Sequence, residues 1–329
     1  MVLLRLAEKN MKKSFFSFSW LVVLVLMVLP ACSIKKLAMN QVANALTGSG
    51  SSTVFTGDND PELVGDALPF AIKMYESLMV ANPRHQGLRL QTGSLYIMYA
   101  NAFLQTPASM LAEAEYQKQE FAYQRAKNLY LRGRDIILAG LENKYPGLRA
   151  ALQKRDYQMA LQRTTRQDAP LLYWAGAGWL GGFAIDAFDM DLGVTLPAAA
   201  ALIERAYRLD PDYAAGALHE FYILYYGSLP EYMGGDLKKA REHYERALAI
   251  SSGRSATPYL SLATSVTVKE QNLAEFKELL NKALAIDPEG VPENRLVNIL
   301  NQRKARWLLE HADDYFLTDE EPGAEAEEK

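Results

Sequence analysis

Apolar residues recur at helical spacing along almost the whole chain beyond residue 57. Asp60 and Pro61 suit a helix start, because an Asp side chain caps free backbone N–H groups and Pro fits the first helical turn. Asn82 and the Pro after it suit the end of that helix. Its apolar positions, three or four residues apart, share one side: Leu63, Ala67, Phe70, Met74 and Leu78. Related patterns predict helices over 88–103, 108–141, 148–161 and 237–250. The chain is therefore predicted to be all-α.

A short helical sequence motif, the repeated phrase, occurs three times between Pro197 and Leu309. Its copies centre on a small residue, at Ala206, Ala247 and Ala283, so the intervals are 41 and 36 residues. Tetratricopeptide helix pairs repeat about every 34 residues, with small residues where their helices touch. One such pair cannot bury its apolar face alone, so neighbouring pairs must stack. We therefore expect a tetratricopeptide-like helical-hairpin repeat, an α-solenoid or superhelix, over residues 58–316.

The first 31 residues have the parts of a secretory signal peptide. Lys12 and Lys13 precede an apolar run over 15–29, which is shorter than the roughly 20 residues of a membrane-spanning helix. The run ends in Leu29-Pro-Ala-Cys32, which resembles the lipobox of bacterial lipoproteins, although Pro30 is uncommon there. We predict lipid attachment at Cys32; the alternative is an ordinary signal cleaved elsewhere.

The two flanks of the helical domain differ from it in composition. Residues 32–57 include a Gly- and Ser-rich stretch around 48–52, which predicts a flexible linker between lipid and domain, with a first helix around 37–46. Residues 317–329 are rich in acids and are predicted to form a disordered tail.

Charge and cysteine content narrow the class of protein. The chain has 35 Lys and Arg against 39 Asp and Glu; the first 31 residues hold four of these bases and one acid, so the rest has a net charge of −7. An acidic body argues against nucleic-acid binding. Cys32 is the only cysteine, which excludes an internal disulfide and a cysteine-based zinc site.

No pattern in the sequence points to catalysis or to a cofactor. His219-Glu220 begins like a zinc-protease motif, but the second His four residues on is absent. A structural role for His219 is favoured over a role in a pocket. We therefore expect a protein that is not an enzyme, with no metal and no cofactor.

Aromatic residues gather in two segments whose role the sequence leaves open. Trp174 and Trp179 stand among Gly and Ala residues over 171–183, and Tyr222 and Tyr226 belong to the run 221–226, followed by Tyr232. Small residues let helices approach closely, and large rings then fill the space between them, so core packing is one interpretation. The other is that these five aromatic residues line an apolar ligand passage.

Several short motifs, in their order along the chain, resemble the T component (TatT) family of tripartite ATP-independent periplasmic (TRAP) transporters. They are the lipobox at Cys32, 58–64 (DNDPELV), 172–174 (LYW), 216–220 (GALHE) and 305–309 (ARWLL). The resemblance implies a periplasmic, lipid-anchored, helical-repeat protein that forms a homotrimer with a pore through each subunit. It also implies docking of the transporter's substrate-binding P component and help in the uptake of a small apolar or organic-acid ligand.

Two rival functions remain open from the sequence. One is a general cell-envelope scaffold for protein assembly, unrelated to transport; the other is an enzyme of unrecognised type, which lacks support from any activated nucleophile or metal cluster. Ser33 after the lipidated cysteine carries no strong signal for inner-membrane retention. The outer membrane is therefore mildly preferred over the inner membrane.

Overall fold

The structure is a computed structural model that describes residues 38–48, 50 and 53–317. The predicted signal peptide, Cys32 and the tail beyond residue 317 lie outside these residues. The described part is built from helices and turns and holds no strand, which confirms the all-α prediction. None of its helices is both long enough and apolar enough to span a membrane.

A helix over 38–47 precedes the numbered elements. The α-helices that follow are α2 (Thr53–Thr56), α3 (Pro61–Ala81), α4 (Gln86–Tyr99), α5 (Thr106–Ala108), α6 (Tyr116–Lys144), α7 (Leu148–Gln153), α8 (Tyr157–Leu161), α9 (Ala169–Ile185), α10 (Met190–Val194), α11 (Leu196–Leu209), α12 (Tyr213–Ser228), α13 (Leu237–Ser251), α14 (Thr257–Leu262), α15 (Leu273–Leu284) and α16 (Arg295–Glu310). Two π-helical turns, η1 (Ala100–Gln105) and η5 (Ala263–Thr267), extend α4 and α14.

Local capping sets the predicted helix ends. The Asp60 carboxylate accepts a hydrogen bond from the backbone N–H of Leu63 at 3.0 Å, and Pro61 occupies the first turn of α3. Asn82 is the C-cap of the same helix. Asp236 caps α13 in the same way, through the N–H of Lys239 at 3.0 Å. A cap needs only neighbours in sequence, so these ends could be predicted.

Two predicted segments differ from the observed ones. The long helix expected over 108–141 begins only at Tyr116, because residues 109–115 form turns and a 3₁₀ segment. The segment 148–161 forms two short helices, since Arg155 takes a left-handed conformation (φ 60°) and Asp156 caps a new helix. The first helix predicted around 37–46 is present over residues 38–47, and it packs on the domain: Ala43 is fully buried, and the Leu46 carbonyl accepts a hydrogen bond from the Tyr75 hydroxyl at 2.8 Å.

The face of α3 that is buried adjoins the apolar face that the sequence pattern indicated. Its core positions are Val64, Leu68, Ala71, Ile72 and Tyr75, which pack against α4. Leu63, Phe70 and Met74 instead lie on the surface, with Phe70 76% exposed. The helical period was correct, but the choice of face was not, because α3 carries apolar residues on two adjoining faces.

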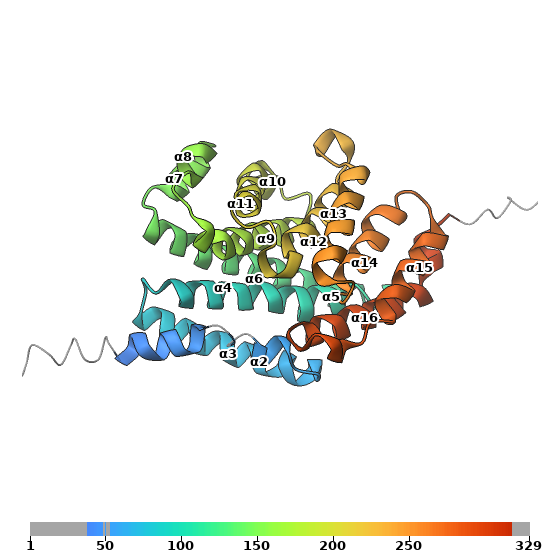
Figure 1. Cartoon of the computed structure of the whole chain (residues 1–329), viewed down its shortest axis with the longest axis horizontal. Coiled ribbons are helices and arrows are strands. Elements are labelled where there is room, and N and C mark those ends of the chain that lie inside the picture. The colour runs from blue at the N-terminus through green and yellow to red at the C-terminus, as the bar shows by residue number, and fades with distance from the viewer. Residues whose placement is uncertain (1–37, 49, 51–52, 318–329) are drawn as a thin grey trace, which may run out of the picture.

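Consecutive long helices pack side by side in chain order, as Figure 1 shows from α3 to α16. Close approach explains some of the glycines. A Cβ on Gly93 of α4 would lie 2.3 Å from Ile137 and 2.8 Å from the Gly133 carbonyl oxygen of α6. The small residues of the three repeated phrases, Ala206, Ala247 and Ala283, are all buried, as expected for helix contacts.

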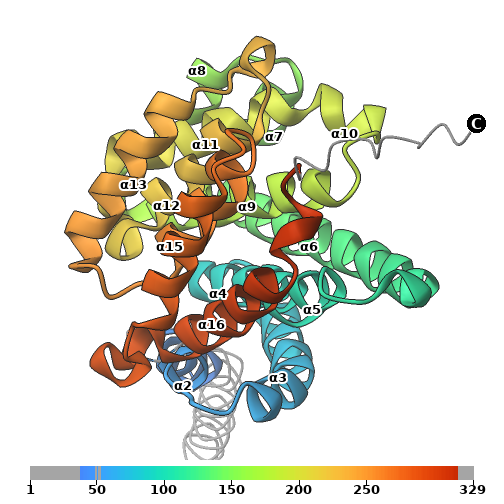
Figure 2. The same ribbon diagram turned by 90° about the vertical axis from the view of Figure 1, so that its right-hand side faces the viewer.

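The carboxyl-terminal helix closes the array onto its beginning. α16 contacts both α2 and α3, and Figure 2 shows the chain returning to its amino-terminal helices. Leu296 is 1% exposed within the core cluster of α3 and α4. The Arg295 guanidinium donates to the Gly57 carbonyl at 3.0 Å. The helices therefore form a closed turn instead of an open rod.

Candidate functional site

Five helices form the inner layer of this closed turn. α4 contacts α9, α9 contacts α12, α12 contacts α14, and α14 contacts α16, whereas α6, α11, α13 and α15 each pack against members of this set. In a curved array, the helices that touch each other in series lie on the inside of the curve. This inner layer carries partly exposed aromatic and polar side chains, which form the candidate site.

The aromatic part of the site is a group of three rings from α9 and α12. The Tyr173 ring lies 5.3 Å from Trp174 and 5.4 Å from Tyr213, measured between ring centroids. Tyr213 reaches this place because Ala214, Ala215 and Gly216 after it are all left-handed, with φ of 48°, 55° and 101°. All three rings are partly exposed, and burial raises the pKa of the Tyr173 hydroxyl. The same three rings pack against the large core cluster of the protein.

Glu220 of α12 adds a carboxyl group beside these rings. Its Oε1 accepts a hydrogen bond from the Ser255 hydroxyl at 2.9 Å. Burial raises the pKa of this carboxyl to about 7, and the Ser255 bond only partly opposes the rise. Tyr173 lies close enough to feel its charge. Near neutral pH a large share of this carboxyl is therefore protonated and uncharged.

Lys304 of α16 is a second ionisable group with a weakened charge. Burial lowers its pKa to about 8. Its ammonium group donates to the Ser109 hydroxyl and lies 4.9 Å from the centre of the Trp307 ring. A partly desolvated ammonium group of this kind can pair with a carboxylate.

A histidine pair lies on the other side of α12, toward α13. The Nδ1 atoms of His219 and His243 are 2.9 Å apart, and the rings of Tyr207 and Tyr222 pack against His243 at 5.9 and 4.8 Å. His219 is buried, and its Nε2 has no hydrogen-bond partner. Burial lowers the pKa of both imidazoles, that of His243 to about 4. Both rings are neutral at pH 7, so the pair is a structural contact.

The five predicted aromatic residues fall in different places. Trp174 belongs to the inner group, whereas Trp179 is buried and donates through Nε1 to Thr195 at 2.9 Å. Tyr222 and Tyr226 stack on each other and on His243, toward α13. Tyr232 lies in a surface loop and is 89% exposed. The structure thus does not bring these five residues into one group.

The predicted ligand passage did not include Tyr173, Tyr213, Glu220 or Lys304, although Tyr173 and Glu220 lie in the motifs 172–174 and 216–220. Tyr173 adjoins Trp174, so the aromatic pattern could have included it. The contact between Glu220 and Ser255 spans 35 residues, and that between Lys304 and Ser109 spans 195. No local signal marks such pairs. Among the residues that the structure describes, no three His, Cys, Asp or Glu side chains gather in a way that could hold a metal ion.

Fold and site together define an all-helical protein with an aromatic inner surface. A family model described as TRAP transporter T-component matches residues 57–316. The chain is also 39% identical over 301 residues to an uncharacterized protein of Treponema pallidum (strain Nichols), a match that covers 87% of this chain and 93% of that relative. The chain belongs to the TRAP transporter T-component family, which is a family of transporter accessory proteins and not of enzymes.

Proposed function

We propose that this protein is a lipid-anchored periplasmic accessory protein of a TRAP-type transporter, which docks the substrate-binding P component and assists ligand uptake. Family membership supports association with the TRAP transport system. The observation that carries the ligand role is the group of three partly exposed rings on the inner layer, Tyr173, Trp174 and Tyr213, which contact each other at 5.3 and 5.4 Å between centroids. Cys32 holds the chain to the envelope, with the outer membrane preferred over the inner one.

The helix array behaves in this proposal as a tetratricopeptide-like superhelix. Helices pack in pairs along the chain, and buried alanines stand at the contacts where the repeated phrases predicted them. Repeat arrays of this kind present extended concave surfaces to their ligands. The inner layer is such a surface, and the closed turn surrounds it.

The chemistry of the inner surface suits an apolar ligand or an organic acid. Trp174 and its neighbours supply apolar contact area, Glu220 is often uncharged, and Lys304 can receive a carboxylate. The buried Trp179 and Tyr222, with Tyr226, support this wall from behind. Tyr232, on the outer loop, is then available to contact the P component.

A homotrimer is the proposed assembly. Leu63, Phe70 and Met74 form an exposed apolar stripe along α3, and such a stripe is typical of a protein interface. In sedimentation velocity, Phe70→Glu is expected to give monomers, whereas Met190→Glu, an equally exposed position on α10, keeps the trimer. Trimers in both variants would contradict the role of this stripe.

The ligand role can be tested with the fluorescent probe 1-anilinonaphthalene-8-sulfonate, which combines an apolar ring system with an anionic group. The mature protein is expected to bind it saturably, and Trp174→Glu is expected to abolish this binding because a charge on the inner wall opposes an anionic apolar molecule. Phe188→Glu is the matched control, since Phe188 is 94% exposed outside the inner layer. Unchanged binding by Trp174→Glu would overturn the proposed site.

A further inference from the structure

One end of the molecule is basic although the chain as a whole is acidic. The segment 142–166, which includes α7 and α8, holds six Lys or Arg against two acids, whereas the whole chain has a net charge of −4. Lys144 pairs with the buried Asp168, and Arg166 pairs with Asp210. The other four, which form no ion pair within the described residues, are all exposed: Arg149, Lys154, Arg155 and Arg163.

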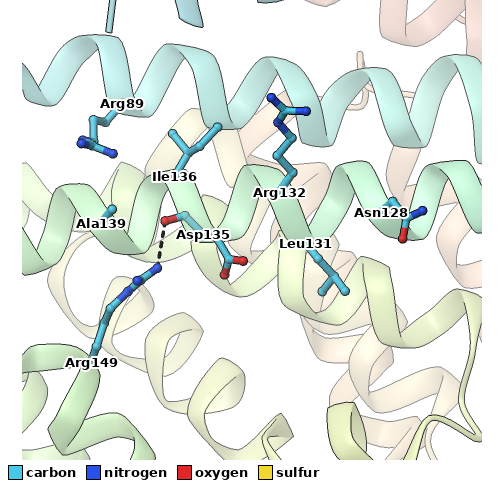
Figure 3. Close-up of a pocket in the computed structure, with 8 residues that line it drawn as sticks. All are labelled: Arg89, Asn128, Leu131, Arg132, Asp135, Ile136, Ala139 and Arg149. Carbon is cyan, nitrogen blue, oxygen red and sulfur yellow. Dashed lines mark hydrogen bonds between the residues drawn. The ribbon is translucent and has the colours of Figure 1, made fainter. Parts of the chain in front are cut away.

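A groove of about 520 Å³ between α4, α6 and α7 lies at this end. Figure 3 shows Arg89 of α4 and Arg149 of α7 on its two sides. Burial and the positive charge of Arg149 both lower the pKa of Arg89, so the two guanidinium groups repel each other. Neither forms an ion pair within the part of the chain that the structure describes.

Both arginines donate to backbone carbonyl groups beside the groove. Arg89 Nε, Arg89 Nη2 and Asn143 Nδ2 all donate to one carbonyl oxygen, that of Pro83, at 3.1, 2.9 and 3.1 Å. Arg149 donates to the backbone carbonyl of Asp135 at 3.0 Å.

The acids near the groove are already engaged. The Asp135 carboxylate pairs with Arg134, and the Glu142 carboxylate accepts from the backbone N–H groups of Gly147 and Arg149. Asp135 also lines the groove, but neither Arg89 nor Arg149 pairs with its carboxylate. Two guanidinium groups that form no ion pair match an oxyanion, above all a phosphate.

The amino-terminal helix begins at the same end. Asn44 contacts His85, just before α4, at 2.9 Å. Figure 1 shows the helix over 38–47 starting at the end of the molecule where α4, α7 and α8 also lie. Only five residues separate Cys32 from residue 38, and an extended residue spans at most about 3.6 Å. A lipid on Cys32 would therefore hold this end close to the bilayer.

We propose that this basic end rests on the anionic surface of the membrane that holds the chain, with a lipid phosphate bound between Arg89 and Arg149. The inference rests on the lipid anchor of the proposed function. Each Lys or Arg near an anionic membrane surface strengthens binding, and the interaction weakens with salt. Docking of this kind would fix the orientation of the inner surface relative to the membrane.

Vesicle co-sedimentation tests this inference. The probe protein is the mature chain from residue 32 with Cys32→Ser, which contains all of the described structure and cannot be acylated. It is expected to bind phosphatidylglycerol vesicles but not phosphatidylcholine vesicles. Arg89→Gln with Arg149→Gln is expected to weaken binding roughly 10- to 30-fold, since each such charge contributes about a factor of five. The matched control removes two exposed arginines elsewhere, Arg246→Gln with Arg306→Gln, and should bind within twofold of the parent.

A second variant guards against an indirect effect, because Arg89 also holds the Pro83 carbonyl. Lys154→Glu with Arg163→Glu reverses charge at exposed positions and is likewise expected to weaken binding. Equal binding to both lipids, or unchanged binding in both basic-end variants, would overturn the inference. The mass of the native amino-terminal peptide reports acylation of Cys32 independently, so failure of the anchor and failure of the docking surface are distinguishable.

Discussion

Arg303 of α16 forms a bidentate ion pair with Glu62 in the first turn of α3, across 241 residues of sequence. The hydrogen bonds from the Arg303 guanidinium lower the pKa of the Glu62 carboxyl. Nearby, Leu296 is buried among the apolar residues of α3 and α4. Polar and apolar contacts thus join the last helix to the first.

The apolar contact is expected to carry the stability of this junction. Leu296→Ala should lower the free energy of unfolding by about 2–5 kcal/mol, since it removes a buried side chain and leaves a cavity. Arg303→Ala should change it little, because exposed ion pairs gain little energy in water. Urea unfolding of both variants measures this; a larger loss for Arg303→Ala than for Leu296→Ala would contradict it.

Gly93 is expected to tolerate no side chain. Gly93→Ala would place a methyl group 2.3 Å from Ile137 and 2.8 Å from the Gly133 carbonyl oxygen, so α4 and α6 must separate. Overpacking of this kind costs about 1–3 kcal/mol. Gly290→Ala is the control, since a Cβ there meets no heavy atom within 4 Å. Thermal unfolding should show a lower midpoint for Gly93→Ala alone; equal midpoints would mean that the helices have room to move.

The elements that could be predicted from the sequence depend on near neighbours. Asp60 and Asp236 cap helices three residues ahead, and the repeated phrases place a buried alanine in each of three helices. The contacts that could not be predicted form only when the helices close into a turn. Glu220 meets Ser255, His219 meets His243, and Leu296 enters the core of α3 only after distant helices have packed.

The buried face of α3 shows a further limit of sequence patterns. Leu63 and Val64 are both apolar, but only Val64 lies in the core. Helical periodicity identifies a stripe, and it cannot say which of two adjoining stripes meets the neighbouring helix. The break at Arg155 was missed for a different reason: its left-handed conformation carries no glycine to mark it.

Glu220 is expected to make stability fall as the pH rises. Its carboxyl has a pKa of about 7 in the folded state and about 4.3 when exposed in the unfolded chain. Between these values the folded state retains a proton that the unfolded state has lost, so folding is progressively disfavoured with rising pH. Glu220→Gln should therefore gain stability relative to the parent from pH 4.5 to 7 and then level off. A pH-independent difference in urea midpoints would show that the carboxyl is not buried as described.

The histidine pair is expected to make stability fall as the pH is lowered. The pKa of His243 is lowered to about 4, and that of His219 is also lowered, whereas an unfolded histidine titrates near about 6.5. Below that value the unfolded state binds protons that the folded state excludes, so stability is lost as the pH falls from 6.5 toward 4. Replacing both with leucine should remove this loss, because paired polar groups exchanged together for apolar ones leave no orphan partner. If the double variant loses stability in acid as steeply as the parent, the pair does not titrate as described.

The central claim is that this protein docks the substrate-binding P component of a TRAP transporter. The direct measurement is isothermal titration of the mature protein with a TRAP substrate-binding protein from the same organism, with an unrelated periplasmic binding protein as control. We predict saturable binding to the TRAP protein alone. No heat of binding, with complex formation also absent in sedimentation velocity at the same concentrations, would contradict the proposed function.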